Sequence, residues 1–336
     1  MKKYLVLVLF TILLFTCKNN KYEVDISKID LNLNLIRFDK DLFSISTDTA
    51  EIKKILPKFR QKYGSFFELY NQNIVNIGNS FSEMYPVYLH IFLTNKTVKT
   101  AWQKANAIFN NDTELRKGLT DAFKHFKYYF PNRLVPEIYT YISGFGDSMV
   151  LADSLVGISM EKYIGANDEV YDMLAIPRYM SRKMYKEKIP SDCVTAWAIG
   201  EFPLTDNGGN NLISRMIYEG KLLYFAKKMI PSQEDTITFG FTKEQLKWCK
   251  DNEKNMWAFL IEQKLLFSTD HVMLVKMTGD APFSQLFPPE SPGRACNWIG
   301  YHIVDKFMQR NSDISLAQLM EDNNHQRIFE KSKYKP

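Results

Sequence analysis

The chain has 336 residues, of which 45% are hydrophobic and 24% charged. This composition excludes a disordered, a collagen-like or a multi-span membrane chain, and the length allows one large domain or two smaller ones. The net charge of +5 comes from dispersed basic residues, which disfavours nucleic-acid binding, and four Cys and five His are too few for a disulfide scaffold or a protein with several metals. Aromatic residues make up 14% of the chain, which favours a dense core with ring surface left for a binding groove.

The first 17 residues have the features of an export signal. A basic start, MKK, precedes an apolar run over residues 4–15. At helical rise this run spans about 18 Å, well short of the hydrocarbon core of about 30 Å, so it is typical of a signal peptide rather than a transmembrane helix. It ends in LFTC, which resembles a bacterial lipobox except at Phe15. We expect a signal peptide over residues 1–16 and a lipid anchor on Cys17; the alternative is a chance Cys after an ordinary signal.

Residues 17–27 are predicted to form a lipid-anchored tether, and residues 28–336 a single helix-rich α+β domain. Alternating Leu and Asn within residues 29–38 predict a half-buried strand. Helical spacing of apolar residues predicts helices over 51–72, 81–95, 98–110, 112–130, 170–184, 191–202, 211–229, 242–264 and 294–311. Strand-forming residues over 137–143, 149–151 and 154–160 predict a small antiparallel sheet.

Common catalytic motifs are missing from the sequence. No two His have the spacing of a local metal site, so we expect neither a metal nor a cofactor, although a site built from distant single His stays open. Gly208-Gly209 is not followed by the Lys-Ser/Thr of a phosphate-binding loop, and no Gly-x-Ser-x-Gly elbow occurs. Cys193, Cys249 and Cys296 can form at most one disulfide with one another.

One candidate site lies on the helix predicted over residues 211–229. Its polar face holds Ser214, Arg215, Tyr218 and Glu219, in which Ser214 and Tyr218, and likewise Arg215 and Glu219, are i, i+4 neighbours. The cluster is either the polar floor of a cleft or an exposed surface pair worth a few tenths of a kcal/mol.

A second candidate site lies on the last predicted long helix. Arg294, Trp298, Tyr301 and His302 place rings and a cation on adjoining helical faces, and Gly300 permits close approach of another backbone. Core packing is the alternative for these rings. Tyr139 and Tyr141 of the strand predicted over residues 137–143 complete the candidate groove.

Long segments of the chain resemble the gliding motility lipoprotein GldB family of Bacteroidetes. They are IRFDKDLF, YIGANDEVYDMLAIPRYMSRKM, IPSDCVTAWAIGEFP, MIYEGKLLYF and PPESPGRACNWIGYHIVDKF. The resemblance implies a membrane-anchored cell-envelope protein of the gliding apparatus, which is linked to type IX secretion. It implies other gliding or secretion proteins as partners and no nucleic acid. Lys18 follows the anchor Cys without an acidic cluster, which favours a body facing the periplasm.

The layout is also similar, more distantly, to a zincin-type metallopeptidase family with a His-Glu-x-x-His helix. Ser214 and Tyr218 stand where that family has its zinc histidines, and Arg215 where it has the general base. Hydroxyls are poor zinc ligands, and a guanidinium cannot act as a base near neutral pH. The resemblance therefore implies a degenerate active site and a non-catalytic binding protein. The alternatives are a hydrolase with Glu201 or Glu219 opposite His302, and a structural link without any groove.

Overall fold

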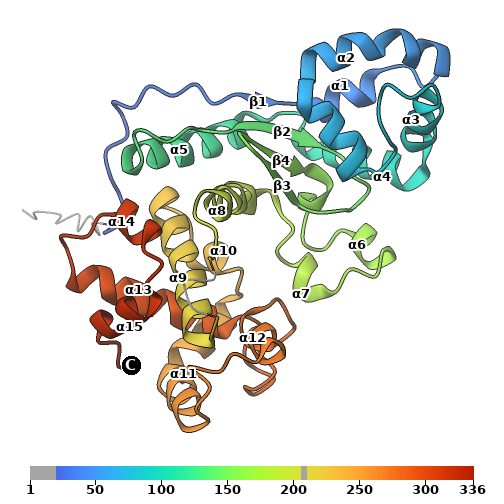
Figure 1. The fold of residues 1–336 in the computed structure, drawn as a ribbon. Coiled ribbons are helices and arrows are strands. Elements are labelled where there is room, and N and C mark those ends of the chain that lie inside the picture. Colours follow the sequence, from blue (N-terminus) through green and yellow to red (C-terminus); the bar gives the residue numbers. More distant parts are fainter. Residues whose placement is uncertain (1–19, 206–209) are drawn as a thin grey trace, which may run out of the picture.

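The computed structural model describes residues 20–205 and 210–336 (Figure 1). The predicted signal peptide, Cys17 and the Gly208-Gly209 pair therefore lie outside the described residues. The strands are β1 (Leu35–Ile36), β2 (Glu137–Tyr141), β3 (Met149–Ala152) and β4 (Leu155–Ser159). The longer helices are α2 (Thr49–Leu69), α3 (Tyr85–Thr94), α4 (Lys96–Phe109), α5 (Thr113–Tyr129), α8 (Ile189–Glu201), α9 (Leu212–Met229), α11 (Lys243–Glu262) and α13 (Ala295–Arg310). The fold is mostly helical with one small sheet, and the α+β class is confirmed.

Shorter helices complete the described chain. They are α1 (Phe38–Ser44), α6 (Glu169–Met173), α7 (Arg178–Ser181), α10 (Asp235–Phe239), α12 (His271–Thr278), α14 (Leu316–Glu321) and α15 (His325–Ser332). The helix predicted over residues 170–184 is broken into α6 and α7. Pro177 begins the second helix, and Ala175 adopts a positive φ of 53°. A positive φ is not a helical conformation, so the helix ends before Ala175. Proline cannot continue a helix either, because it lacks an amide donor and restricts the residue before it.

The sheet is mixed, so the prediction of an antiparallel sheet is wrong. Its strand order is β1-β2-β4-β3, in which β1–β2 and β2–β4 are parallel and only β3–β4 is antiparallel. β3 follows β2 in the chain but forms the edge of the sheet. β4 then turns back and pairs between β2 and β3. The sequence pattern predicts the strands but not the order in which they pair. It therefore could not predict that β2 is a central strand.

Only two residues of the strand predicted over residues 29–38 pair with the sheet. Leu31 and Leu33 nevertheless pack against the large core, so their alternation with Asn reflects burial on one side without a strand partner. The chain leaves the sheet at Arg37, and α1 begins at Phe38.

Two hydrophobic clusters occupy the two faces of the sheet. Ile138 and Val156 belong to the large cluster, together with side chains of α4, α5, α8, α9 and α13. Tyr139, Tyr141 and Leu155 belong to the second cluster, which α1, α2 and α3 complete. Successive residues of a strand point to opposite faces, so this division follows from the period of two. Helix α8 lies between the sheet and α9 (Figure 1).

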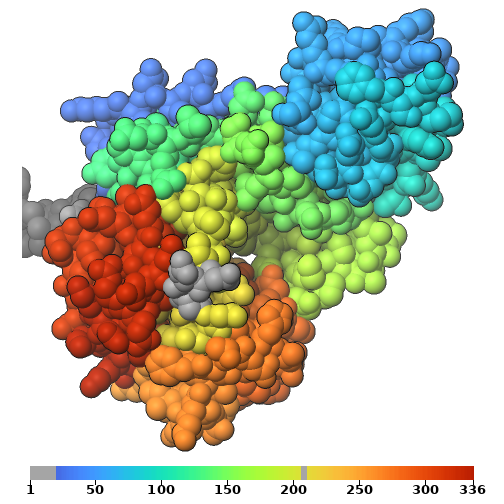
Figure 2. Space-filling view, viewed as in Figure 1, coloured from blue at the N-terminus to red at the C-terminus, as the bar shows by residue number. Residues whose placement is uncertain are grey.

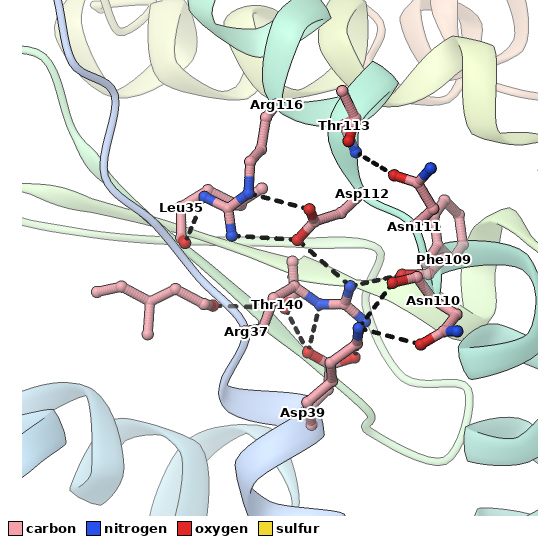
Figure 3. Close-up of polar contacts among 12 residues, drawn as sticks. Leu35, Arg37, Asp39, Phe109, Asn110, Asn111, Asp112, Thr113, Arg116 and Thr140 are labelled. Atoms are coloured by element: carbon pink, nitrogen blue, oxygen red, sulfur yellow. Dashed lines mark hydrogen bonds and ion pairs between the residues drawn. The ribbon is translucent and has the colours of Figure 1, made fainter.

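A buried ion pair joins β1 and α1 to the rest of the fold (Figure 3). Arg37 donates two hydrogen bonds to Asp39, at 2.9 and 2.7 Å, and a third to the Phe109 carbonyl at 2.7 Å. Its guanidinium also lies 3.6 Å from Asp112, and Thr140 of β2 donates to Asp39 at 2.5 Å. The pair belongs to the IRFDKDLF segment, which therefore has a structural role in fastening elements from four parts of the chain.

Helices α9 and α13 cross at two glycines. A Cβ atom on Gly300 would lie 1.8 Å from the Met216 carbonyl oxygen, and one on Gly220 would lie 2.3 Å from the Gly300 carbonyl. No side chain fits at either position, so both residues must be glycine for the backbones to approach this closely. The close approach predicted at Gly300 is confirmed.

Candidate functional site

The polar face predicted on α9 is largely buried. Asn211 caps the helix by accepting a hydrogen bond from the Ser214 amide at 3.0 Å. Ser214 and Tyr218 are both buried, and burial, followed by the charge of Glu219, raises the pKa of Tyr218 to about 12. Two members of this face are therefore inside the protein, whereas Arg215 and Glu219 are half-buried.

Glu219 turns toward the start of α13. Asn297 donates a hydrogen bond to its carboxylate at 3.3 Å, and the Arg294 guanidinium lies 3.9 Å away. Burial raises the pKa of Glu219, while Arg294 and Arg215 oppose that shift. The structure thus brings together Glu219 of one predicted site and Arg294 of the other.

Arg294, which lies beside Glu219, also lines a cleft of about 370 Å³, which we call the ionic cleft. The cleft lies between the loop before β3, α8 and the segments around Met180 and Asp280. Its charged lining residues are Lys162, Lys183, Lys188, Arg294, Asp147, Asp192 and Asp280. Among these, only Arg294 was a site residue in the sequence analysis. Lys188 and Asp192 are i, i+4 neighbours, but the remaining residues come from separate parts of the chain, and no local pattern joins them.

Ion pairs fix the charges of the ionic cleft. Lys183 pairs with Asp280 at 2.8 Å, and Lys188 pairs with Asp192 at 2.6 Å. Burial lowers the pKa of Lys183 despite its partner. Burial acts to raise the pKa of Asp280, but Arg294 and Lys183 outweigh it and hold that pKa below its usual value. The cleft therefore presents fixed charges of both signs, which suit a polar or charged ligand.

The other predicted groove residues do not form one groove. Tyr139 and Tyr141 lie on β2, which is flanked on both sides, and the Tyr139 ring stacks on Phe66 at 4.0 Å in the second cluster. Trp298 and Tyr301 are buried in the large cluster instead. All four rings are core residues, and they belong to two separate clusters, so they cannot line one groove.

The carboxylates predicted to face His302 lie elsewhere. Glu201 pairs with Arg133 at 2.7 Å, and Glu219 contacts α13 through Asn297. His302 packs on the Trp298 ring at 4.1 Å, and burial lowers its pKa. The structure does not bring the proposed hydrolase residues together. Within the described parts of the chain, no three His, Cys, Asp or Glu side chains gather as a metal site.

Sequence reasoning missed a second hollow, of about 700 Å³, which we call the apolar groove. It is lined by Val75, Asn76, Ile77, Gly78, Tyr88, Ile91, Phe92, Asn95, Thr97, Val98, Ser143 and Gly144. The lining residues Tyr88 and Ile91 of α3 are exposed to solvent, as are Val87 in the same helix and Met84 just before it. The available signal was the run YPVYLHIFL, because its apolar residues cover more of the helix than one buried stripe requires.

A buried acid fixes the wall of the apolar groove at residues 143–146. The fully buried Glu161 accepts hydrogen bonds from the Ser143 amide at 2.6 Å and from the Phe145 amide at 3.1 Å. The Ser143 hydroxyl donates to the same oxygen at 2.8 Å. Gly144 and Phe145 both have positive φ, of 78° and 75°, so the carboxylate holds a turn that the chain would otherwise disfavour.

Comparisons with known proteins identify the family. Among the described residues, none of the helices is both long enough and apolar enough to cross a membrane. No curated protein and no solved structure gives a significant match to the chain. One family model, described as gliding motility protein GldB, matches residues 19–336. The match spans all of the described fold and agrees with the long segments of resemblance, so the chain belongs to the GldB family of gliding motility lipoproteins.

Proposed function

We propose that this protein is a lipid-anchored, non-catalytic binding component of the gliding machinery, linked to type IX secretion, with its body in the periplasm. The exposed apolar side chains of α3 around the apolar groove carry the proposal. Contiguous exposed apolar surface beside a hollow is typical of an interaction site, whereas single exposed apolar residues are not. The occupant is an apolar segment of another protein of the machinery, inserting side chains beside Ile91 and Tyr88.

The groove is suited to binding because its shape is formed before a partner arrives. Glu161 fixes the loop at one wall, and the other side of α3 is packed in the second cluster through Tyr85, Leu89 and Leu93. A rigid site loses little conformational entropy on binding, so more of the burial energy remains as affinity. The lobe formed by α1–α3 also stands out from the rest of the surface (Figure 2), where a large partner can reach it.

Substitution of Ile91 tests this binding role. Ile91→Asp places a charge at the apolar groove, whereas Ile261→Asp makes the same change on α11, at a side chain of similar exposure (57% and 51%). We expect Ile91→Asp to reduce crosslinking to gliding-machinery proteins in intact cells at least tenfold, since an unpaired charge in an apolar interface costs more than about 1.4 kcal/mol. Mass spectrometry of the crosslinked peptides measures the loss. Equal crosslinking by the two variants, with normal folding, contradicts the proposal.

We further propose that α9 derives from a metallopeptidase helix whose chemistry has been lost. Ser214 and Tyr218 lie four residues apart on one face of α9, and in the register of the sequence resemblance they take the places of the zinc ligands, with Arg215 in place of the base. Neither hydroxyl is a good zinc ligand, and activation of a zinc-bound water requires both ligands and base. Stoichiometric zinc in the purified protein, measured by elemental analysis, would overturn this proposal.

A hydrolase is the alternative, and the raised pKa of Glu219 is the observation that favours it. Glu219 lies 3.9 Å from Arg294, which lines the ionic cleft, and an acid with a perturbed pKa beside a cleft is typical of a general acid or base. Peptidase activity that survives a chelator and disappears in Glu219→Gln would replace the binding role with a catalytic one.

A further inference from the structure

The described chain begins bound to the body of the protein. The Asn20 side chain donates a hydrogen bond to the Pro231 carbonyl at 2.5 Å, just beyond the end of α9. Lys21 forms an ion pair with Asp305 of α13 at 2.7 Å. Residues 20 and 21 were predicted to belong to a tether, yet both hold fixed positions on the surface.

Tyr22 makes this attachment firm. Its ring is buried, with an edge-on contact to Tyr224 at 5.8 Å, and its hydroxyl lies 2.5 Å from the Tyr301 hydroxyl and 3.1 Å from Asp305. Lys228 places its ammonium 5.2 Å from the centre of the same ring. Burial of the ring removes apolar surface from water, and together with the hydroxyl contacts it holds the segment on the body.

The length of free chain before this attachment is very short. Cys17 precedes Asn20 by three residues, and three fully extended residues span only about 10 Å. A folded body of this length has a radius of gyration of about 20 Å. A lipid on Cys17 therefore cannot let the body turn freely, and whichever face surrounds Asn20 must stay near the membrane.

The face around Asn20 is formed by the ends of α9 and α5, and we call it the anchor face. Lys228 lies over the Tyr129 ring at 5.6 Å as well as over Tyr22, and Tyr128 packs edge-on against Tyr129 at 5.0 Å. Tyr128 is exposed to solvent at the end of α5. Tyrosine is enriched at the headgroup level of membranes, because its ring is apolar and its hydroxyl polar.

We propose that the anchor face lies against the phospholipid headgroups and that the apolar groove points away from the membrane. The inference rests on the lipid anchor of the proposed function. The described chain begins at one side of the molecule, and α3 lies at the opposite side (Figure 1). Lys21 pairs with Asp305 and Lys227 pairs with Asp235, so two of the lysines near Asn20 are neutralised, while Lys228 lies over the rings of Tyr22 and Tyr129. The short length of chain between Cys17 and Asn20, rather than attraction to anionic lipids, sets this orientation.

Two variants of the full lipidated chain, each with one introduced cysteine, test the orientation. The three unlipidated cysteines of the chain are buried, so an introduced exposed thiol can be labelled selectively. Tyr128→Cys places a fluorophore on the anchor face, and Tyr88→Cys places it beside the apolar groove, at tyrosines of similar exposure (49% and 45%). The labelled proteins are reconstituted into phosphatidylcholine–phosphatidylglycerol vesicles that carry a nitroxide quencher on the headgroup. We expect at least threefold stronger quenching at residue 128, unchanged in high salt.

Separate outcomes distinguish the anchor from the orientation. Protein that does not float with the vesicles, or floats equally well as Cys17→Ser, overturns the lipid anchor and the orientation together. Protein that floats but shows equal quenching at the two positions, or stronger quenching at residue 88, overturns the orientation alone. A difference in quenching between residues 128 and 88 that disappears in high salt would show that attraction to anionic lipids, and not the short chain between Cys17 and Asn20, sets the orientation. Tyr22→Ala lengthens the free chain and is expected to reduce the contrast, whereas Tyr22→Phe keeps the buried ring and most of the contrast.

Discussion

Lys221 shows how one buried charge can hold two distant helices together. Its side chain is almost fully buried within α9, and its ammonium donates to the Met320 carbonyl at 3.0 Å and to the Asp322 carbonyl at 2.9 Å. These carbonyls end α14, where the helix dipole favours a cation. Burial nevertheless lowers the pKa of Lys221 to about 8, because desolvation outweighs the favourable contacts.

The lowered pKa predicts an unusual dependence of stability on pH. Between about pH 8 and 10, the unfolded chain keeps a proton at Lys221, whose unfolded pKa is about 10.4, while the native chain releases it. The free energy of unfolding therefore rises with pH in this window, by at most about 1.4 kcal/mol per pH unit from this group. Lys221→Met should lose this contribution, and Lys247→Met, at an exposed lysine, should keep it. Urea denaturation at four pH values measures the difference; identical slopes for both variants contradict it.

At the scale of elements, the crossing of α9 and α13 organises the C-terminal half. Their closest approach occurs where Gly220 faces Gly300. The sequence predicted both helices from the spacing of apolar residues, and it predicted the close approach at Gly300. It did not predict α10, α12, α14 or α15, because these short helices contain too few turns to show a period and are stabilised by packing on the long ones.

Alanine at Gly300 is expected to destabilise the protein, although alanine favours a helix by about 1 kcal/mol over glycine. Its Cβ would overlap the Met216 carbonyl, so the helices must separate, at a cost of at least about 1–3 kcal/mol. Gly200→Ala in α8 is the matched control, because its Cβ would meet only Leu151 at an ordinary 3.6 Å. Thermal unfolding should show a lower Tm for Gly300→Ala and an equal or higher Tm for the control. A Gly300→Ala protein as stable as the control would show that the crossing is not tight.

On the scale of the whole molecule, the sheet separates a lobe of α1–α3 from the larger helical body. The Arg37–Asp39 pair fastens the two, since it connects β1 and α1 with β2 and the end of α4. The second cluster then closes over the other face of the sheet. The attachment of the lobe therefore combines apolar packing with one buried pair of charges.

Removal of one member of this pair is expected to be costly. Arg37→Ala leaves the fully buried Asp39 without its cation, for which a loss of about 3–5 kcal/mol in the free energy of unfolding is typical. Lys54→Ala removes a cation from the exposed Lys54–Glu51 pair of α2, and less than about 0.5 kcal/mol is expected. Equilibrium denaturation compares the two variants. Similar losses for both would mean that Asp39 is stabilised by Thr140 and its surroundings rather than by Arg37.

Periodicity predicted where most long helices lie, because one buried stripe repeats over several turns. It could not predict the two hollows. The ionic cleft collects Lys162, Lys183, Asp192 and Asp280 from separate elements, and only tertiary packing brings them together. The predicted groove residues do not come together for a related reason: Tyr139 and Trp298 have residue types that suit both cores and binding surfaces, and the packing of β2 and α13 buries them in different clusters.

The contacts of Lys21 and Tyr22 also bear on the order of events during export. Each contacts a residue of α13, and 284 positions of chain separate Lys21 from Asp305. A chain that crosses a membrane from its N-terminus presents residues 21 and 22 long before residue 305, and long-range contacts form only when both partners are present. The beginning of the chain therefore stays free throughout translocation. Under the proposed lipid anchor, acylation of Cys17 precedes the folding of the last helices, after which the chain length limits that cysteine to within about 10 Å of Asn20.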